Sequence, residues 1–487
     1  MIFYSIFLFL LFFLAFRKGG NKESQPLGVW TYSFAFTIKV IAGVSFLVIY
    51  SLFYGNGELS YDANFFMVDS GILHHVFSES PSDYFKLLFG TGNTEQLTIQ
   101  YLQDTTHWDS GESKIINDNR FVIRIHSLIH FISYGQITIH LMLMCVISTL
   151  ALKQFYKAII RYSLLSPKII FISLLFLPSL LFWSSSILKE PILLLGFAIF
   201  IRALLDEKLK NKRIFYFIIS ILILIRIKPY ILLISLFSIL SFFIFNSLRR
   251  FKIIGTITII ASATLILLAL FPSNSKKIIH TISKKQFDFI NVGNGGLHAL
   301  TKNEFYYFKP NQIKDLKIKD DSVWITKPID AIVIRKEFNI ETRKKIDLTP
   351  NGSKWYIYFN NIPARGLITV TPINNSPLQL MKNIPESIIN VLFRPIPTDP
   401  GGKMKYLAFI ETIILFSFLT LSIFHRKKVS NKEKAILFSI SVFILLLSLL
   451  IGWTTPVLGA IVRYRIPAYL GILFIALILY APKSSSE

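Results

Sequence analysis

Residues 435–452 read AILFSISVFILLLSLLIG, a run without a single charged residue. A helix of this length covers most of a hydrocarbon layer of roughly 30 Å and satisfies its own backbone hydrogen bonds there. Apolar runs recur along the chain at 1–16, 37–54, 136–152, 169–187, 191–205, 214–225, 230–248, 253–271, 406–424, 435–452 and 462–481. The sequence therefore predicts an all-α polytopic membrane protein with about eleven transmembrane helices.

The composition favours a membrane protein over a soluble one. Hydrophobic residues make up 53% of the 487 residues and charged residues only 16%, whereas soluble domains carry about 25% charged residues. The net charge of +24 is expected from basic cytoplasmic loops, so no nucleic-acid partner is predicted. Cys145 is the single cysteine, which excludes a disulfide framework within the chain.

Every second short loop is basic, and Lys and Arg near span ends are retained on the cytoplasmic side. The alternation predicts a multi-pass protein of a cell membrane with its N-terminus outside and its C-terminus inside. The basic residues are Arg17, Lys18 and Lys22; Lys153, Lys157, Arg161 and Lys168; Lys208, Lys210, Lys212 and Arg213; Arg249, Arg250 and Lys252; and Arg426, Lys427, Lys428, Lys432 and Lys434.

Two long segments are predicted to lie outside. The expected divisions are two first spans (1–54), an acidic extracytoplasmic loop with amphipathic helices (55–135), a transmembrane bundle (136–271), an extracytoplasmic α+β domain (272–405), and C-terminal spans with a short cytoplasmic tail (406–487). In the α+β domain, alternating apolar residues at 354–359 and 366–371 predict β-strands. Asn351-Gly352 and Asn374-Asn375 are turn signals there.

Asp62 and Asp69 are the candidate catalytic residues. They lie in YDANFFMVD, residues 61–69, shortly after the second predicted span. If this stretch is helical, a spacing of seven puts both carboxylates within about 20° of one face. Partial burial beside a membrane raises the pKa of a carboxyl group toward that of a useful general base. The alternative is a solvated amphipathic helix at the interface.

Six basic residues stand at the predicted outer ends of spans, where the orientation rule disfavours them. Guanidinium groups match phosphate oxygens bidentately and an ammonium acts as a point charge, so these residues predict a phosphate-binding site. Snorkelling to lipid headgroups is the alternative. The six are Lys189, Arg226, Lys228, Arg394, Arg463 and Arg465.

Two further acids, Glu190 and Glu411, are possible site residues. Glu411 lies about six residues inside the ninth predicted span, where a carboxylate must face the protein interior or a wet cavity. Structural pairing with Arg394 or Lys405 is the alternative to catalysis. The nine His show no metal-ligand spacing, so no metal site is predicted.

An acidic first outer loop, cations at the outer rim and a late extracytoplasmic domain resemble the polyprenyl-phosphate-dependent membrane glycosyltransferases of the GT-C class, which include protein O-mannosyltransferases and aminoarabinose transferases. Pro178 to Pro191, with its FWSS and Lys189-Glu190, resembles segments of proteins from bacterial surface-polysaccharide clusters, as does Arg463 to Pro467. The resemblance implies a bacterial cytoplasmic membrane. Asp62 matches the acidic residue of the first outer loop, but Ala63 follows where O-mannosyltransferases usually have an adjacent Asp-Glu pair.

The resemblance implies transfer of a sugar from a polyprenyl-phosphate donor to a glycan, lipid or protein acceptor on the extracytoplasmic face. A carboxylate would accept the acceptor's proton while Arg and Lys stabilise the leaving phosphate. An O-antigen or exopolysaccharide repeat-unit polymerase or ligase is the nearest alternative. A polysaccharide transporter or flippase ranks third, because neither internal repeats nor ionisable groups at the bilayer midplane are evident.

Overall fold

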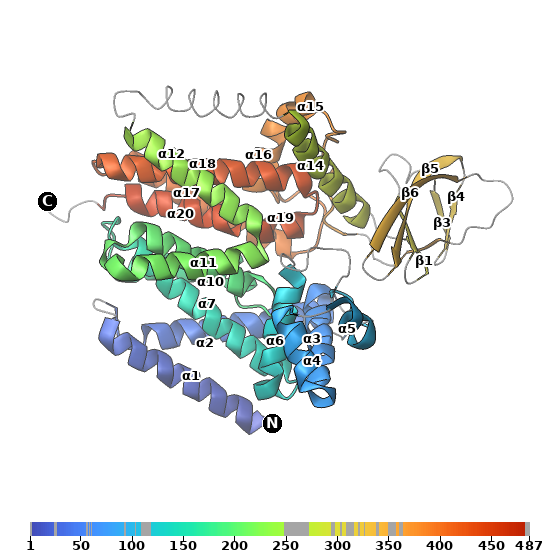
Figure 1. Ribbon diagram of the computed structural model, residues 1–487. Helices are drawn as coiled ribbons and strands as arrows, with labels where there is room; N and C mark the ends of the chain where they lie inside the picture. The colour runs from blue at the N-terminus through green and yellow to red at the C-terminus, as the bar shows by residue number, and fades with distance from the viewer. Residues whose placement is uncertain are drawn as a thin grey trace. The chain divides into compact units, whose positions relative to one another are not determined.

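The computed structural model describes residues 2–23, 27–54, 57, 59, 61–91, 94–102, 104–108, 118–247, 272–293 and 364–482 (Figure 1). It also describes 327, 328 and seven strands between residues 298 and 359. The chain splits into two compact units. The first unit comprises Met1–Ser235, Phe418–Val429 and Leu473–Glu487, and the second comprises Leu236–Ser417 and Ser430–Ile472.

The first unit is helical in its described residues. Its helices are α1 (Ile2–Glu23), α2 (Thr31–Val48, continued by a π turn, Ile49–Phe53), α3 (Tyr61–Glu79), α4 (Pro81–Phe89), α5 (Thr94–Tyr101), α6 (Asp118–Ser133), α7 (Ile137–Ile159), α8 (Pro167–Leu175), α9 (Pro178–Ser184), α10 (Glu190–Leu205), a 3₁₀ helix (Glu207–Lys212), α11 (Arg213–Ile227) and the start of α12 (Pro229–Ser247).

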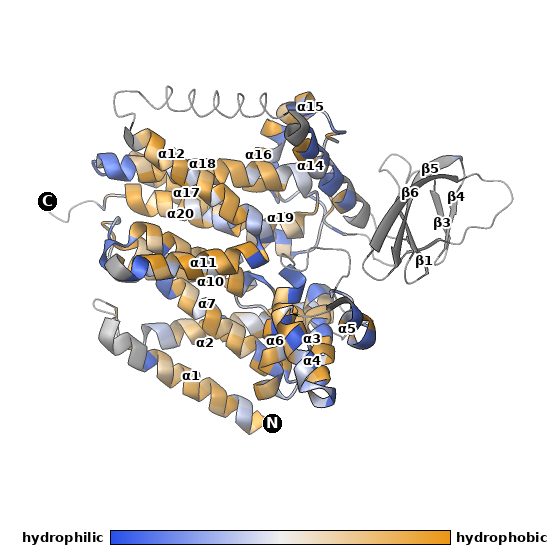
Figure 2. Ribbon diagram, viewed as in Figure 1, coloured by the Kyte–Doolittle hydropathy of each residue, from blue (hydrophilic) through white to orange (hydrophobic). Residues whose placement is uncertain are grey.

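Apolar side chains bring these helices together. Helix α7 packs against α2 and α10, α10 packs against α11, and α3 packs against α6 and α4. Gly196 permits the close approach of α10 and α11, because a Cβ there would lie 2.6 Å from a methyl carbon of Ile223. Figure 2 shows the bodies of α7, α10 and α11 as mostly hydrophobic. Core and lipid-facing surface are therefore both apolar, as the bilayer requires.

The second unit contains the rest of α12, α14 (Pro272–Gly293), α15 (Pro377–Lys382), α16 (Ile384–Leu392), most of α17 (Met404–Phe424), α18 (Asn431–Thr454), α19 (Leu458–Tyr464) and the start of α20 (Ile466–Leu479). Helix α16 packs against α18 and α19, and α14 packs against α18. A Cβ on Gly452 would lie 2.5 Å from the backbone of Ser387. Glycine is therefore required where α16 crosses α18.

Seven strands of the second unit form one sheet in the order β3-β4-β7-β1-β2-β5-β6, with antiparallel neighbours. They are β1 (His298–Thr301), β2 (Glu304–Tyr307), β3 (Leu316–Lys319), β4 (Ser322–Ile325), β5 (Ile329–Glu337), β6 (Ile340–Leu348) and β7 (Ile357–Phe359). Strand β7 falls within the predicted stretch 354–359. The predicted turn at Asn351-Gly352 lies outside the described residues.

The predicted strand at 366–371 is wrong. This stretch is extended, but it makes only an isolated bridge, between Leu367 and Val457. Its apolar alternation has another cause, because Ile368 and Val370 are buried while their neighbours are more exposed. The turn predicted at Asn374-Asn375 is confirmed, since both residues have positive φ, 52° and 57°. Asn tolerates this left-handed conformation better than most residues.

Four described helices are long and apolar enough to cross a membrane: α2 with its π turn, α7, α17 and α18. Two bent pairs also pass when each is taken together, α8 with α9 at 61° and α19 with α20 at 50°. Pro178 and Pro467 stand at the starts of α9 and α20, where a missing N–H donor ends the preceding helix. The described residues thus support four to six spans of a multi-pass membrane protein.

The predicted count of eleven spans is not reached in these residues. Helices α10 and α11 have only 16 and 15 residues, shorter than the roughly 20 that a bilayer needs. The apolar parts of α1 and α12 are also short, and the predicted run 253–271 lies outside the described residues. The larger count therefore stays a prediction.

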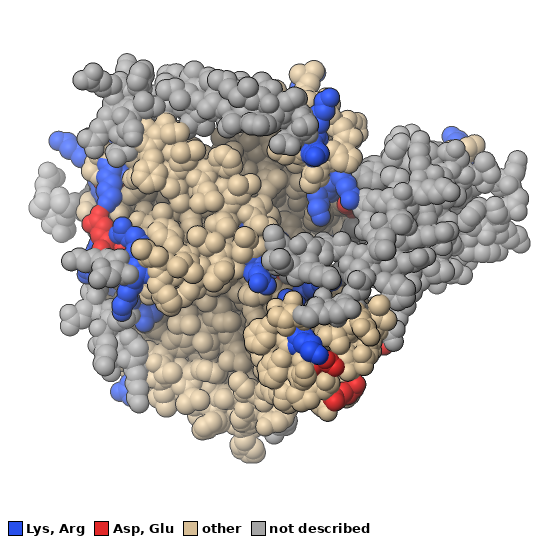
Figure 3. All heavy atoms as spheres, in the orientation of Figure 1, with Lys and Arg blue, Asp and Glu red and all other residues tan. Residues whose placement is uncertain are grey.

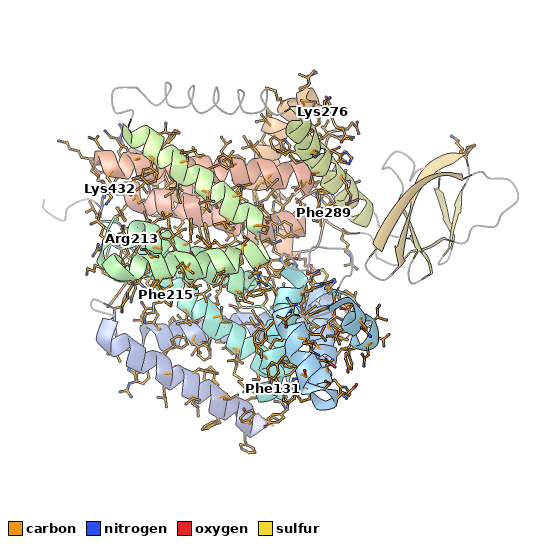
Figure 4. All side chains as sticks on the ribbon, viewed as in Figure 1. Phe131, Arg213, Phe215, Lys276, Phe289 and Lys432 are labelled. Carbon is orange, nitrogen blue, oxygen red and sulfur yellow. The ribbon has the colours of Figure 1, made fainter. Side chains whose placement is uncertain are left out.

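Charge in the first unit is concentrated at helix ends. Ile214, Phe215, Ile218 and Leu222 on α11 are more than half exposed, as expected for a lipid-facing flank. The visible flank of α11 is uncharged, and Lys and Arg gather near the end occupied by Arg213 (Figures 3 and 4).

Several predicted cytoplasmic loops meet at that end. Asp206 lies 3.2 Å from Arg202 and 3.8 Å from Arg161, and Arg213 donates a hydrogen bond to its carbonyl. Lys427 donates to the carbonyl of Tyr162. Residues from three predicted basic loops therefore share one end of the first unit. The predicted N-outside orientation assigns this end to the cytoplasm.

Single-cysteine labelling tests that orientation. In a Cys145→Ala background, a cysteine at Ser82 should react with an impermeant thiol reagent added outside intact cells, and one at Lys428 should react only after permeabilisation. Both positions are exposed. They avoid Ser430, whose side chain caps α18. The reverse pattern would move every proposed site residue to the cytoplasm.

Candidate functional site

Asp69 on α3 anchors a neighbouring loop. The side chain is fully buried, and its two carboxylate oxygens accept hydrogen bonds from the backbone N–H groups of Thr106 at 2.9 Å and His107 at 2.6 Å. Burial raises the pKa of Asp69, while these two N–H donors oppose the shift. With both oxygens engaged by the backbone, Asp69 holds the loop in place rather than facing a substrate.

Asp62 lies on the same helix and is accessible. Its side chain is 42% exposed, and one carboxylate oxygen lies 3.5 Å from Nε2 of His107. The His107 ring packs against Phe65 and Phe66, with ring centroids 4.9 and 5.6 Å apart. Asp69 thus fixes the backbone of His107, and His107 faces Asp62. The predicted helix over residues 61–69 is confirmed, and the two acids have different environments.

Asp118 connects two of the predicted phosphate ligands. It is the first residue of α6, and one of its carboxylate oxygens lies 2.6 Å from Nζ of Lys189 and 4.0 Å from Nζ of Lys228. Lys189 precedes α10 and Lys228 follows α11, so two antiparallel helices bring both ammonium groups to one carboxylate. Asp62 also interacts electrostatically with Lys189. The acids of α3 and α6 thus share a cation.

Three arginines crowd the same part of the first unit. The guanidinium groups of Arg120 and Arg124 lie 5.3 and 5.0 Å from the Trp108 ring centroid, and Nε of Arg124 donates to the carbonyl of Leu87 at 2.9 Å. Burial lowers the pKa of Arg124 to about 10, and the like charges of Arg120 and Arg226 lower it further. An anion placed here would relieve this repulsion.

The protonation states fit an anion-binding region. Burial alone would raise the pKa of Asp118, but Lys189 and Lys228 together hold it below the usual value, so the carboxylate stays charged. Burial lowers the pKa of Lys189, and Asp118 opposes that shift. Five basic residues therefore gather near two accessible acids, Asp62 and Asp118. The local charge is net positive.

The turn that carries Lys189 is held at its start by buried polar contacts. Ser184, the last residue of α9, lies 2.8 Å from Nζ of Lys39 on α2 and 2.8 Å from Oγ of Ser148 on α7. Lys39 is only 2% exposed. A cation beside the C-terminus of a helix also favours the orientation of the helix dipole.

A buried histidine chain holds the same turn near its end. Ser133 lies 2.8 Å from Nε2 of His140, whose Nδ1 lies 2.9 Å from Nδ1 of His126. His126 Nε2 lies 3.1 Å from the carbonyl of Ile187. A carbonyl only accepts, so His126 carries its proton on Nε2 and accepts from His140. Burial lowers the pKa of His126 to about 4, which keeps the ring neutral.

Two matched variants test this chain. His126→Gln places an amide N–H near the position of Nε2 and should keep the bond to Ile187, whereas His126→Asn reaches only as far as Nδ1. The Asn variant should lose about 1–3 kcal/mol of stability, because a buried carbonyl is left without a donor. Unfolding midpoints in detergent would measure the difference. An equal loss in both variants would contradict the proposed direction of the chain.

Arg465 has a structural role in the second unit. It is fully buried, and its guanidinium donates to the carbonyls of Val391 at 3.0 Å and Arg394, and to Thr412 Oγ1 at 3.3 Å. It also lies 4.1 Å from the ring centroid of Tyr469. Because α16 ends at Leu392, Arg465 neutralises the carbonyls at its C-terminus. This geometry differs from the predicted phosphate ligand.

The remaining predicted residues of the second unit have separate environments. Arg394 lies 3.6 Å from Asp399. Glu411 is 1% exposed and interacts electrostatically with Arg465, not with either partner considered from the sequence. Arg463 is half-buried on α19, with its guanidinium 6.0 Å from the Tyr464 ring centroid. These contacts tie helices together.

Replacing Arg465 should therefore affect folding. Arg465→Ala leaves three acceptors and Glu411 without the buried cation, so the expected loss is about 3–5 kcal/mol. Arg465→Lys should recover part of it, since one ammonium cannot reach every acceptor. Thermal unfolding in detergent is the measurement, with Arg463→Ala as the matched control. A fully stable Arg465→Ala variant would return Arg465 to the candidate ligands.

The structure brings four predicted site residues into one region of the first unit: Asp62, Lys189, Arg226 and Lys228. Glu190 is also in the first unit, buried in the first turn of α10. Sequence reasoning missed His107, Asp118, Arg120 and Arg124. The spacing of Arg120 and Arg124 on one helix face, one turn apart after Asp118, was the available signal.

Among the described residues, no group of three or more His, Cys, Asp or Glu side chains is arranged to hold a metal ion. No family model, no curated protein and no solved structure matches this chain. The functional argument therefore depends on the geometry of the first unit.

Proposed function

We propose that the protein is a membrane glycosyltransferase that transfers a sugar from a polyprenyl-phosphate carrier to a glycan, lipid or protein acceptor on the extracytoplasmic face. One observation carries the proposal. Lys189, Lys228, Arg120, Arg124 and Arg226 crowd around Asp118, with like-charge repulsion at Arg124. Such a cluster suits a phosphate, because Lys supplies point charges and Arg a bidentate fork.

Within this proposal, the described helices belong to a GT-C-like fold of about eleven spans, and residues 272–405 lie outside. The predicted orientation places the ends of α10 and α11 that carry Lys189 and Lys228 at the outer membrane surface. A phosphate attached to a polyprenyl chain must also sit at such a surface. The cluster and the headgroup would then occupy the same depth.

The reaction needs a base and a stabilised leaving group. The acceptor hydroxyl oxygen forms a bond to the anomeric carbon while the bond from that carbon to the phosphate oxygen breaks. Asp62 accepts the hydroxyl proton, and the phosphate departs with the bonding electron pair. Lys189 and Lys228 stabilise the charge that develops on the departing oxygen. His107, 3.5 Å from Asp62, orients the carboxylate.

Two donors distinguish this function from its nearest alternative. Purified protein in nanodiscs would receive either a polyprenyl phosphate bearing one sugar or a polyprenyl diphosphate bearing an oligosaccharide, with an envelope glycan extract as acceptor. Release of polyprenyl phosphate from the first donor is the expected result. Turnover of the second donor alone would indicate a repeat-unit polymerase or ligase. Turnover of neither would contradict the proposal.

A further inference from the structure

Helix α14 of the second unit is amphipathic, with a basic side. Lys276, Lys277, Lys284 and Lys285 fall with His280 on one half of the helix, at 100° per residue. Lys276, Lys277 and Lys285 are exposed, and Lys284 is partly exposed. Figure 3 shows Lys and Arg atoms spaced along this helix, and Figure 4 marks Lys276 near its start. These four lysines are called the α14 basic face below.

The opposite side fixes the helix to the second unit. Gln286 and Ile290 are buried. The amide nitrogen of Gln286 donates to the carbonyl of Thr371 at 3.1 Å, and its oxygen accepts from the N–H of Ile373 at 2.9 Å. A helix held by specific contacts on one side presents its other side in a defined direction. The α14 basic face is therefore a fixed surface.

The charge of this face is not neutralised by neighbouring acids. In the part of the chain that the structure describes, no carboxylate lies within ion-pair distance of any of the four lysines. The polar contact of His280 is with Asn375, 3.3 Å away. A ligand for this face should therefore be anionic.

The position of α14 points to a membrane surface. It begins at Pro272, directly after the predicted span 253–271. At its other end, a Cβ on Gly293 would lie 3.3 Å from Val457, three residues beyond the candidate span α18. Ile278, at the edge of the basic side, is 54% exposed. Lysines beside an exposed apolar residue are typical of helices that lie in the interface.

We propose that the α14 basic face binds the phosphate headgroups of anionic phospholipids at the membrane surface. Each lysine near an anionic surface contributes roughly a fivefold preference, and salt screens it. The inference does not depend on the proposed transferase activity. A soluble anionic polymer is the other possible occupant, and the following experiment separates the two.

Local lipid composition can be measured at α14 in the full-length protein. Thr281, exposed on the polar side, is replaced by Cys in a Cys145→Ala background and labelled with a fluorophore. Nanodiscs contain equal amounts of phosphatidylglycerol and phosphatidylcholine, and only one of the two is brominated. We expect brominated phosphatidylglycerol to quench on the order of threefold more strongly at low salt, and the difference to shrink at high salt.

Two quadruple variants at Lys276, Lys277, Lys284 and Lys285 decide the cause. Replacement of all four by Gln should equalise quenching by the two lipids, and replacement by Arg should preserve the difference because the charge is kept. Equal quenching in the parent protein would overturn the proposal. If quenching is equal while dextran sulfate changes the fluorescence, a soluble polyanion is the ligand. A difference that survives the Gln variant would also overturn it.

Discussion

Lys189→Ala should weaken binding of polyprenyl phosphate by about 10- to 100-fold, the usual effect of losing a hydrogen bond to a charged group. Nζ of Lys189 lies 2.6 Å from Asp118, at the position where an anionic ligand would compete with that carboxylate. Lys228, 4.0 Å from the same oxygen, should give a smaller loss. Affinity can be measured by titrating polyprenyl phosphate into the purified protein in detergent.

The control is Lys86→Ala in the same unit. Lys86 pairs with Asp83 on α4, 2.8 Å away, and its side chain is 46% exposed. It removes one positive charge without touching the cluster, so affinity should stay at the parental level. If Lys86→Ala weakens binding as much as Lys189→Ala, the effect is one of overall charge and the site assignment fails.

Asp62→Asn should reduce turnover by roughly 10²-fold or more while binding survives, because the amide keeps the size of the side chain but removes its basic oxygen. The measurement is sugar transfer at saturating lipid-linked donor. Asp83→Asn, which changes another accessible carboxylate of the first unit, should leave turnover near the parental value. Parental turnover in Asp62→Asn would transfer the catalytic role to Asp118 or Glu190.

Asp69→Asn should act differently from Asp62→Asn. Asp69 accepts two backbone N–H groups through two oxygens, and an amide offers only one acceptor. Its loss would therefore release the loop that carries His107, and the defect should appear as lower stability together with lower turnover.

The apolar runs were the readable part of the fold. The runs at 136–152, 406–424 and 435–452 correspond to α7, α17 and α18, because unbroken apolar stretches of membrane length have few other uses. The breaks at Pro178 and Pro467 were underestimated, since the chain stays apolar on both sides of each proline. Hydropathy reports the solvent of a helix, but the bend depends on one missing N–H.

The candidate site was only half readable. The orientation rule found Lys189, Arg226 and Lys228 because cations at outer span ends are unexpected. It also selected Arg465, whose guanidinium is occupied by carbonyls at the end of α16. Sequence position alone does not distinguish a cation that faces a ligand from one that neutralises a helix end. Asp118 was missed because its importance comes from residues 71 and 110 positions away.

The most direct test of the account is a structure of the protein in lipid nanodiscs with polyprenyl phosphate bound. We expect density for the phosphate in the first unit, with its oxygens about 3 Å from Nζ of Lys189 and Nζ of Lys228, in place of the present contact to Asp118. Phosphate density at the opposite end, beside Arg161, Arg202 and Arg213, would contradict both the site and the predicted orientation.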